Sequence, residues 1–137
     1  MARSGTGAVH TICPVEVHLH GKKALSESTG SISIRFQHDG THFDCVSYTR
    51  FISRLEFVGD EWRLLTLEAI YDRDLITPVI PQRTAEFHFP KNARKSYRCI
   101  SWVLSQNGFS IKQDLPGIDD PTSCAQLMEA SFKWLGI

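Results

Sequence analysis

Residues 61–81 read EWRLLTLEAIYDRDLITPVIP, an amphipathic strand whose apolar run ends in four ionisable residues. These four are Tyr71, Asp72, Arg73 and Asp74. Such a run marks either the point where a strand meets water or the rim of a pocket. The patterns in the rest of the chain bear on which of the two applies.

Three stretches before this strand show the alternation of apolar and polar residues that is typical of half-buried strands. They run from residue 10 to about 21, through residues 32–36, and from 43 to 57. Asp39-Gly40 is a strong hairpin signal, and Gly59-Asp60 is a second turn. We therefore expect a meander of long antiparallel strands, the fourth running from residue 61 to about 72.

The chain after this strand changes character. Pro78 and Pro81 predict an irregular link or an edge segment, and residues 86–89 predict a short piece of strand. Helical spacing of apolar residues follows over residues 93–107.

A second helix is expected over residues 120–135. Asp120 suits the N-cap and Pro121 the first helical position. Strands first and helices last predict a single α+β domain over residues 1–137, with a curved antiparallel sheet and C-terminal helices. Two helices barely cover such a sheet, so we expect the remaining apolar face to be buried in a homodimer.

The composition excludes several classes of protein. Of 137 residues, 42% are hydrophobic, and 15 basic residues balance 15 acidic ones. A nucleic-acid-binding surface needs clustered Lys and Arg, so none is expected. No apolar stretch reaches the ~20 residues that span a bilayer, and the N-terminus lacks the apolar core of a secretory signal. Nucleic acid and membrane are therefore not expected as partners.

The cysteines point to a reducing, cytoplasmic setting. Cys13, Cys45, Cys99 and Cys124 are far apart and form no CxxC pair. A disulfide framework or a zinc ribbon is therefore not expected, and we interpret the four as core residues.

Three segments together resemble a known family. They are AVHTICPVEVHLHGKKALSES (8–28), FDCVSYTRFISRLE (43–56) and GDEWRLLTLEAIYDRD (59–74). The strand that His10 opens, the GKKALSES turn and the GDEW hairpin with Trp62 are similar to the sheet half of the SnoaL-like branch of the NTF2-like superfamily. The resemblance covers roughly residues 8–75. It implies a cone, in which a bent sheet wraps around helices and leaves a pocket at its open end.

The chain also departs from this family. Members usually carry helices before the strand that His10 opens, and these helices often supply a catalytic Asp or Tyr. The scytalone dehydratase pattern has a second pocket His where this chain has Ile34. The segment after Pro81 lies outside the resemblance.

The branch includes polyketide cyclases, scytalone dehydratase and ketosteroid-isomerase-like enzymes. The resemblance therefore implies a cofactor-free cyclase, dehydratase or isomerase of secondary metabolism, whose substrate is a small apolar polyketide- or terpenoid-like carbonyl compound. The alternative is a non-catalytic NTF2-like module that binds a ligand or dimerises through its sheet. An enzyme needs His10 aimed into an enclosed apolar cavity, whereas a binding module leaves it on the surface.

His10 is the first candidate catalytic residue, because a neutral imidazole takes or gives a proton near pH 7. Tyr48 and Arg50 lie two apart on one strand and so share a face, where phenol and guanidinium can hold a developing enolate. A bulge would exchange this face for that of Ser47 and Thr49. The alternatives are a surface histidine, a cross-strand aromatic residue and an exposed arginine.

Tyr71 is the candidate polar group at the pocket mouth. It shares a strand face with three residues that would line the pocket, Leu65, Leu67 and Ala69. Asp72 points the other way unless the strand bends, in which case it joins the substrate-binding set. Otherwise residues 72–74 form a solvated rim of ion pairs, which contributes little energy.

Glu16, His18 and His20 alternate on one strand face, and imidazoles at i and i+2 can converge on a metal. No further carboxylate follows at the usual short distance. We therefore favour an exposed polar face and expect no metal.

Overall fold

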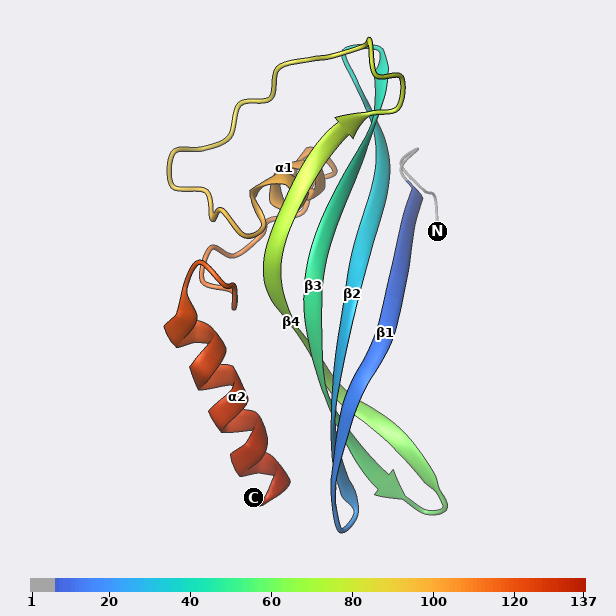
Figure 1. Ribbon diagram of the computed structural model, residues 1–137, viewed down its shortest axis with the longest axis vertical. Coiled ribbons are helices and arrows are strands. Elements are labelled where there is room, and N and C mark those ends of the chain that lie inside the picture. The colour runs from blue at the N-terminus through green and yellow to red at the C-terminus, as the bar shows by residue number, and fades with distance from the viewer. Residues whose placement is uncertain (1–6) are drawn as a thin grey trace.

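The structure, a computed structural model, describes residues 7–137. Four antiparallel strands form one sheet in the order β1-β2-β3-β4 (Figure 1). The strands are β1 Gly7–His20, β2 Lys23–His38, β3 Thr41–Val58 and β4 Glu61–Pro78, and the helices are α1 Arg98–Gln106 and α2 Pro121–Leu135. The predicted α+β fold, with a curved antiparallel sheet followed by two helices, is confirmed.

The structure contains the hairpin turn and the helix end that the residue types predicted. Asp39 and Gly40 both have positive φ, 50° and 74°, which suits a two-residue hairpin turn. Helix α2 has Asp120 at its N-cap and Pro121 in its first turn, and it ends at Gly136 in the left-handed conformation, with φ 97°.

The structure corrects four of the predictions. Strand β4 continues to Pro78 rather than ending near residue 72, because β3 offers pairing partners as far as Phe43. Residues 86–89 form no strand, although the ring of Phe87 packs on the core. Helix α1 begins at Arg98, since residues 91–97 are turns and irregular backbone. Cys45 and Cys99 are buried as expected, whereas Cys13 is exposed.

The two helices cover opposite faces of the sheet. Leu25 and Ile34 on β2 are an odd number of positions apart, so their side chains point to opposite faces. Ile34 belongs to a cluster with Tyr97, Ile100 and Val103 at α1. Leu25 belongs to a second cluster with Leu135 of α2. We refer to these surfaces as the α1 face and the α2 face.

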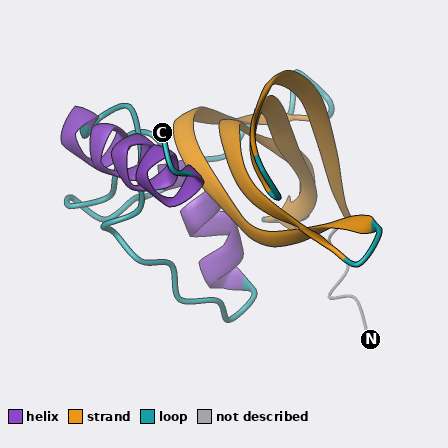
Figure 2. Cartoon of the chain, turned by 90° about the horizontal axis from the view of Figure 1, so that it is seen from below, coloured by secondary structure: helices purple, strands orange, loops and turns teal. Residues whose placement is uncertain are grey.

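Each helix covers only part of its face. In Figure 1 α1 lies against the upper half of the strands and α2 beside the lower half. Figure 2 shows how strongly the sheet twists and curls. Because of this twist both helices lie to one side of the molecule, although they pack on opposite faces of the strands. The part of the α1 face near the β1–β2 and β3–β4 turns is therefore a separate surface, described below.

Candidate functional site

A β-bulge in β4 determines which ionisable residues share a face. Tyr48 pairs with Arg73 and the next residue, Thr49, pairs with Tyr71, so Asp72 is the extra residue. Tyr71 and Asp74 consequently both lie on the α1 face, although simple alternation would separate them. The sequence left a bend of this strand open as an alternative, and the structure has an irregularity there, with Asp72 as the extra residue.

The bulge creates a buried polar cluster beneath α1. Asp74 pairs with Ser47, and Thr49 is two residues further along the same face of β3. Ser47 is fully buried and Thr49 is 4% exposed. Among the described residues, Ser47 Oγ, Thr49 Oγ1 and Asp74 Oδ1 have no hydrogen-bond partner. Buried polar atoms are rarely left unpaired, so this cluster is unusual for a protein interior.

Helix α1 holds the Asp74 carboxylate from the other side. The backbone N–H of Ile100 donates a hydrogen bond of 2.8 Å to Asp74 Oδ2. Burial raises the pKa of Asp74, and the donors at Ile100 and Cys99 only partly offset this effect. The carboxyl group therefore keeps its proton to a higher pH than an exposed aspartate does, which suits a proton donor.

Tyr71 lies beside this cluster, and neighbouring segments hold both its ring and its backbone. Its ring packs on the ring of Tyr97 with 4.8 Å between centroids. Its backbone bonds the segment before α2, through Tyr71 N–H to Pro116 O and Ile118 N–H to Tyr71 O. Burial, with a smaller effect of Tyr97, raises the pKa of Tyr71, so its phenol is a neutral donor.

His10 lies on the α1 face but far from this cluster. Its row across the sheet runs through Ile32 and Ser47 to Asp74. Strands are spaced about 4.8 Å apart, so three spacings separate His10 from Asp74 by roughly 14 Å. His10 is also exposed. The geometry therefore does not pair the histidine with Asp74 or Tyr71 directly.

Tyr48 and Arg50 share a face, as predicted, but it is the α2 face. The sheet thus separates both from Tyr71. The exposed ring of Tyr48 lies under the guanidinium of Arg73, 5.4 Å away. Arg50 donates a hydrogen bond of 3.1 Å to Glu27 Oε1. The alternative pair, Ser47 and Thr49, are the hydroxyls that lie on the side of Tyr71.

The predicted pocket-lining residues of β4 divide into two groups. Leu65 and Leu67 are each 49% exposed, whereas Ala69 and Asp72 are half-buried. Leu67, Ala69 and Tyr71 share the α1 face, as expected, because they pair with alternate residues of β3. Leu65 is the extra residue of a second irregularity in the pairing.

An apolar surface occupies the open end of the α1 face. Leu19, Ala24, Leu55 and Leu64 pair in one continuous row across all four strands. We call the exposed residues around this row the open patch. They are Val17, Leu19, Leu64 and Leu67, with 56%, 66%, 57% and 49% exposed. Within residues 7–137 neither helix covers them.

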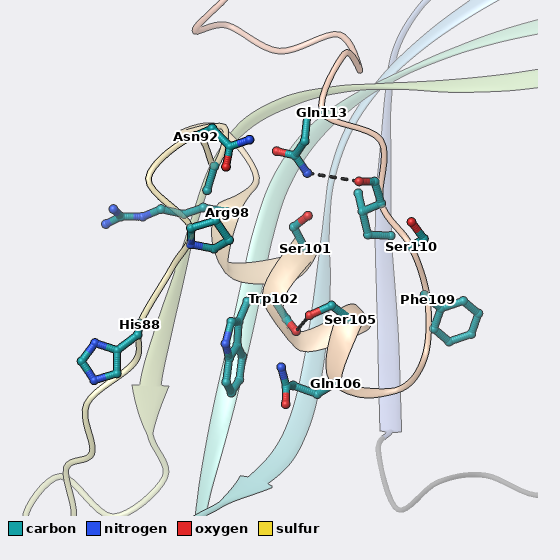
Figure 3. Close-up of a pocket in the computed structure, with 13 residues that line it drawn as sticks. His88, Asn92, Arg98, Ser101, Trp102, Ser105, Gln106, Phe109, Ser110 and Gln113 are labelled. Atoms are coloured by element: carbon teal, nitrogen blue, oxygen red, sulfur yellow. Dashed lines mark hydrogen bonds between the residues drawn. The ribbon is translucent and has the colours of Figure 1, made fainter.

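Other hollows among residues 7–137 lie away from the buried polar cluster. One of about 560 Å³ lies between α1 and the loops before and after it, where Arg98, Trp102, Phe109 and Gln113 are among the lining residues (Figure 3). Another, of about 470 Å³, lies near Arg35 at the β2–β3 turn. Among the residues described as lining them, none is a residue predicted for catalysis or binding.

Sequence reasoning missed Asp74 as a member of the candidate site. Alternation from Tyr71 assigns Asp74 to the opposite face, where it would belong to a solvated rim. The run Tyr-Asp-Arg-Asp was itself the available signal, because a bulge at either residue between Tyr71 and Asp74 moves the last carboxylate to the face of Tyr71.

Comparisons with known proteins give a distant likeness. No model of a known protein family matches the chain. A PEP2-like protein of Fusarium vanettenii is 27% identical over 105 residues, and Pea pathogenicity protein 2 of the same fungus is 23% identical over 105 residues. Each match covers 74% of this chain and 45% of the relative, so the chain spans less than half the length of either. Neither name states a reaction or a ligand.

One finding concerns membranes. Among residues 7–137, neither helix has the length and apolar character needed to cross a bilayer.

Proposed function

We propose that this chain is a binding module with the NTF2-like type of sheet, and that it associates with a second copy of itself through the open patch. The observation that carries the proposal is the apolar row Leu19, Ala24, Leu55 and Leu64, whose two outer members are 66% and 57% exposed. His10 lies on the surface, as a binding module leaves it.

The chemistry of the patch supports a protein partner. Contiguous apolar surface on a protein usually marks an interaction site, and burying one Leu side chain contributes about 1.5–3 kcal/mol. Two copies of a chain with formal net charge zero do not repel each other. An apolar row is also complementary to itself, which is what a two-fold interface requires.

Substitutions on the two faces of the sheet test this proposal. Leu19→Glu and Leu64→Glu place a charge in the interface and should weaken association by ~100-fold, or about 3 kcal/mol. Val9→Glu is the matched control, because Val9 is 65% exposed on the same strand but pairs with Ser33 on the α2 face. Size-exclusion chromatography at low and high micromolar concentration should show dimers of wild type and Val9→Glu and monomers of the other two. Equal behaviour of all four proteins would refute the proposal.

A second candidate is the cofactor-free acid–base enzyme, acting on a small carbonyl compound. The half-buried Asp74 with its raised pKa and the two unpaired hydroxyls favour it. In this scheme His10 removes the proton from the carbon next to the carbonyl of a substrate long enough to span the distance between His10 and Asp74. Asp74 donates its proton to the carbonyl oxygen and Tyr71 hydrogen-bonds the same oxygen, so the step yields a neutral enol.

Turnover of a panel of polyketide-like carbonyl compounds tests this candidate. Asp74→Asn keeps the shape and the acceptor for Ile100 N–H, and should lower turnover ~10²–10⁴-fold. Tyr71→Phe should cause a smaller loss, and Tyr48→Phe, on the α2 face, none. Undiminished turnover by Asp74→Asn would remove Asp74 from the mechanism. If the wild-type protein converts none of the compounds, the binding module is the function that stands.

A further inference from the structure

Three potential metal ligands meet on the α2 face near α2. Glu16 and His18 come from β1, and Glu27 is the partner of Glu16 on β2. His18 Nε2 lies 3.3 Å from Glu27 Oε2 and 3.6 Å from Glu16 Oε2. The three ligand atoms all lie within 4.8 Å of one another.

This spacing fits a small divalent cation. Zinc binds imidazole nitrogen and carboxylate oxygen at about 2.1 Å, so two ligands of a tetrahedral site are ~3.4 Å apart. The distances from His18 to the two carboxylates bracket this value. A cation at their centre could contact all three atoms after small side-chain movements.

Neighbouring groups already orient two of the three ligands. Arg50 donates to Glu27 Oε1, which leaves Oε2 facing His18. The His18 ring packs edge-on against Phe132 with 5.0 Å between centroids. The His18 and Glu27 side chains are 25% and 17% exposed, whereas Glu16 is 58% exposed and can close over an ion from solvent. Partners of this kind commonly fix the ligands of metal sites.

We propose that Glu16, His18 and Glu27 bind a divalent transition-metal ion of the zinc type, with a further position open to water or an exogenous ligand. The sequence pattern Glu-x-His-x-His suggested His20 as a ligand, but His20 Nδ1 bonds Leu135 O at 2.8 Å. Glu27 supplies the carboxylate that the local pattern lacked, because the β1–β2 turn brings it opposite Glu16. The proposal thus departs from the expectation of no metal.

The competing arrangement needs no metal. A protonated His18 would form ion pairs with both carboxylates at the same distances. The two arrangements differ in whether the cluster takes up a cation with a defined stoichiometry and geometry.

Metal titration of the whole chain distinguishes them. Zn²⁺ titrated in a calorimeter should bind one ion per chain, and Co²⁺ should give the visible absorption of a low-symmetry, four- or five-coordinate site. Glu16→Gln should weaken Zn²⁺ binding at least ~10-fold and is exposed enough to leave the fold intact. Glu68→Gln is the matched control, because Glu68 is an exposed carboxylate of the same cross-strand row, beyond Ile52.

Each outcome decides the matter. One-to-one binding that Glu16→Gln weakens and Glu68→Gln does not would support the site. Absence of saturable binding at micromolar Zn²⁺, or equal loss in the two variants, would leave His18 as an ion-pair partner only. The readout is binding itself, so it is independent of dimer formation and of turnover.

Discussion

Asp74 has the most unusual environment among the ionisable residues at the end of β4. Its carboxylate is buried against α1, one oxygen accepts the Ile100 N–H, and the other lacks a partner among the described residues. Burial without full pairing makes the ionised form costly, which is why the pKa of Asp74 rises.

Asp74→Asn should therefore change the pH dependence of stability. Below the ordinary aspartate pKa of ~3.9, both the folded and the unfolded wild type are protonated at this residue. As the pH rises from there through the raised pKa of the folded state, the unfolded state loses its proton first and wild type loses stability. The stability of Asp74→Asn relative to wild type should thus increase with pH across this window and then level off.

Urea unfolding of both proteins at a series of pH values measures this difference. Ser47→Ala is the control, since it alters the same cluster without removing an ionisable group. A difference between Asp74→Asn and wild type that stays flat or falls with rising pH would show that Asp74 is not destabilised by burial.

Sequence alone predicted only part of this cluster, for a physical reason. The shared face of Leu67, Ala69 and Tyr71 follows from a side-chain period of two, and the structure has it. A bulge depends on how two strands pair, and no residue type at position 72 requires one. The residue pattern of one strand therefore does not determine on which face of the sheet Asp74 lies.

At the scale of elements, a clamp around Arg94 fixes where α1 begins. The Arg94 guanidinium binds both oxygens of Asp119, at 2.9 and 2.7 Å, and the carbonyls of Gln113 and Leu115. The Arg94 guanidinium and the Ser96 hydroxyl hold the pKa of Asp119 well below its usual range. These contacts tie the start of α1 to the segment before α2, and so support the helix that covers Asp74.

Gly117→Ala should disturb this clamp. A Cβ at Gly117 would overlap Ser96 Oγ and lie 2.7 Å from Asp119 Oδ1. Overpacking of this kind costs about 1–3 kcal/mol, so thermal unfolding should shift down by several degrees. Gly7→Ala is the matched control, because a Cβ there meets no atom within 4 Å. Equal melting temperatures for both variants would mean that the contacts around Arg94 rearrange without a loss of stability.

The same clamp explains which elements could be predicted. The long strands and α2 are predicted by local features of the sequence, namely alternation, turn residues and capping positions. The start of α1 instead depends on Arg94 reaching Asp119, 25 residues away. Helical spacing alone therefore placed the start of α1 too early.

At the scale of the whole molecule, the open patch is exposed because the two helices do not cover both faces of the sheet completely. A four-stranded sheet has two faces, each helix covers part of one, and the remaining part of the α1 face keeps Val17, Leu19, Leu64 and Leu67 exposed. The sequence predicted this shortage of cover but could not locate it, because the face that each helix covers depends on contacts between distant segments, such as Leu135 with Leu25.

The molar mass of the wild-type protein in solution tests the central claim most directly. Sedimentation equilibrium from low to high micromolar concentration should give the mass of two 137-residue chains, with dissociation to one chain only on dilution. The mass of a single chain throughout this range would contradict the account, because the open patch would then face water at concentrations where a self-complementary interface should be occupied.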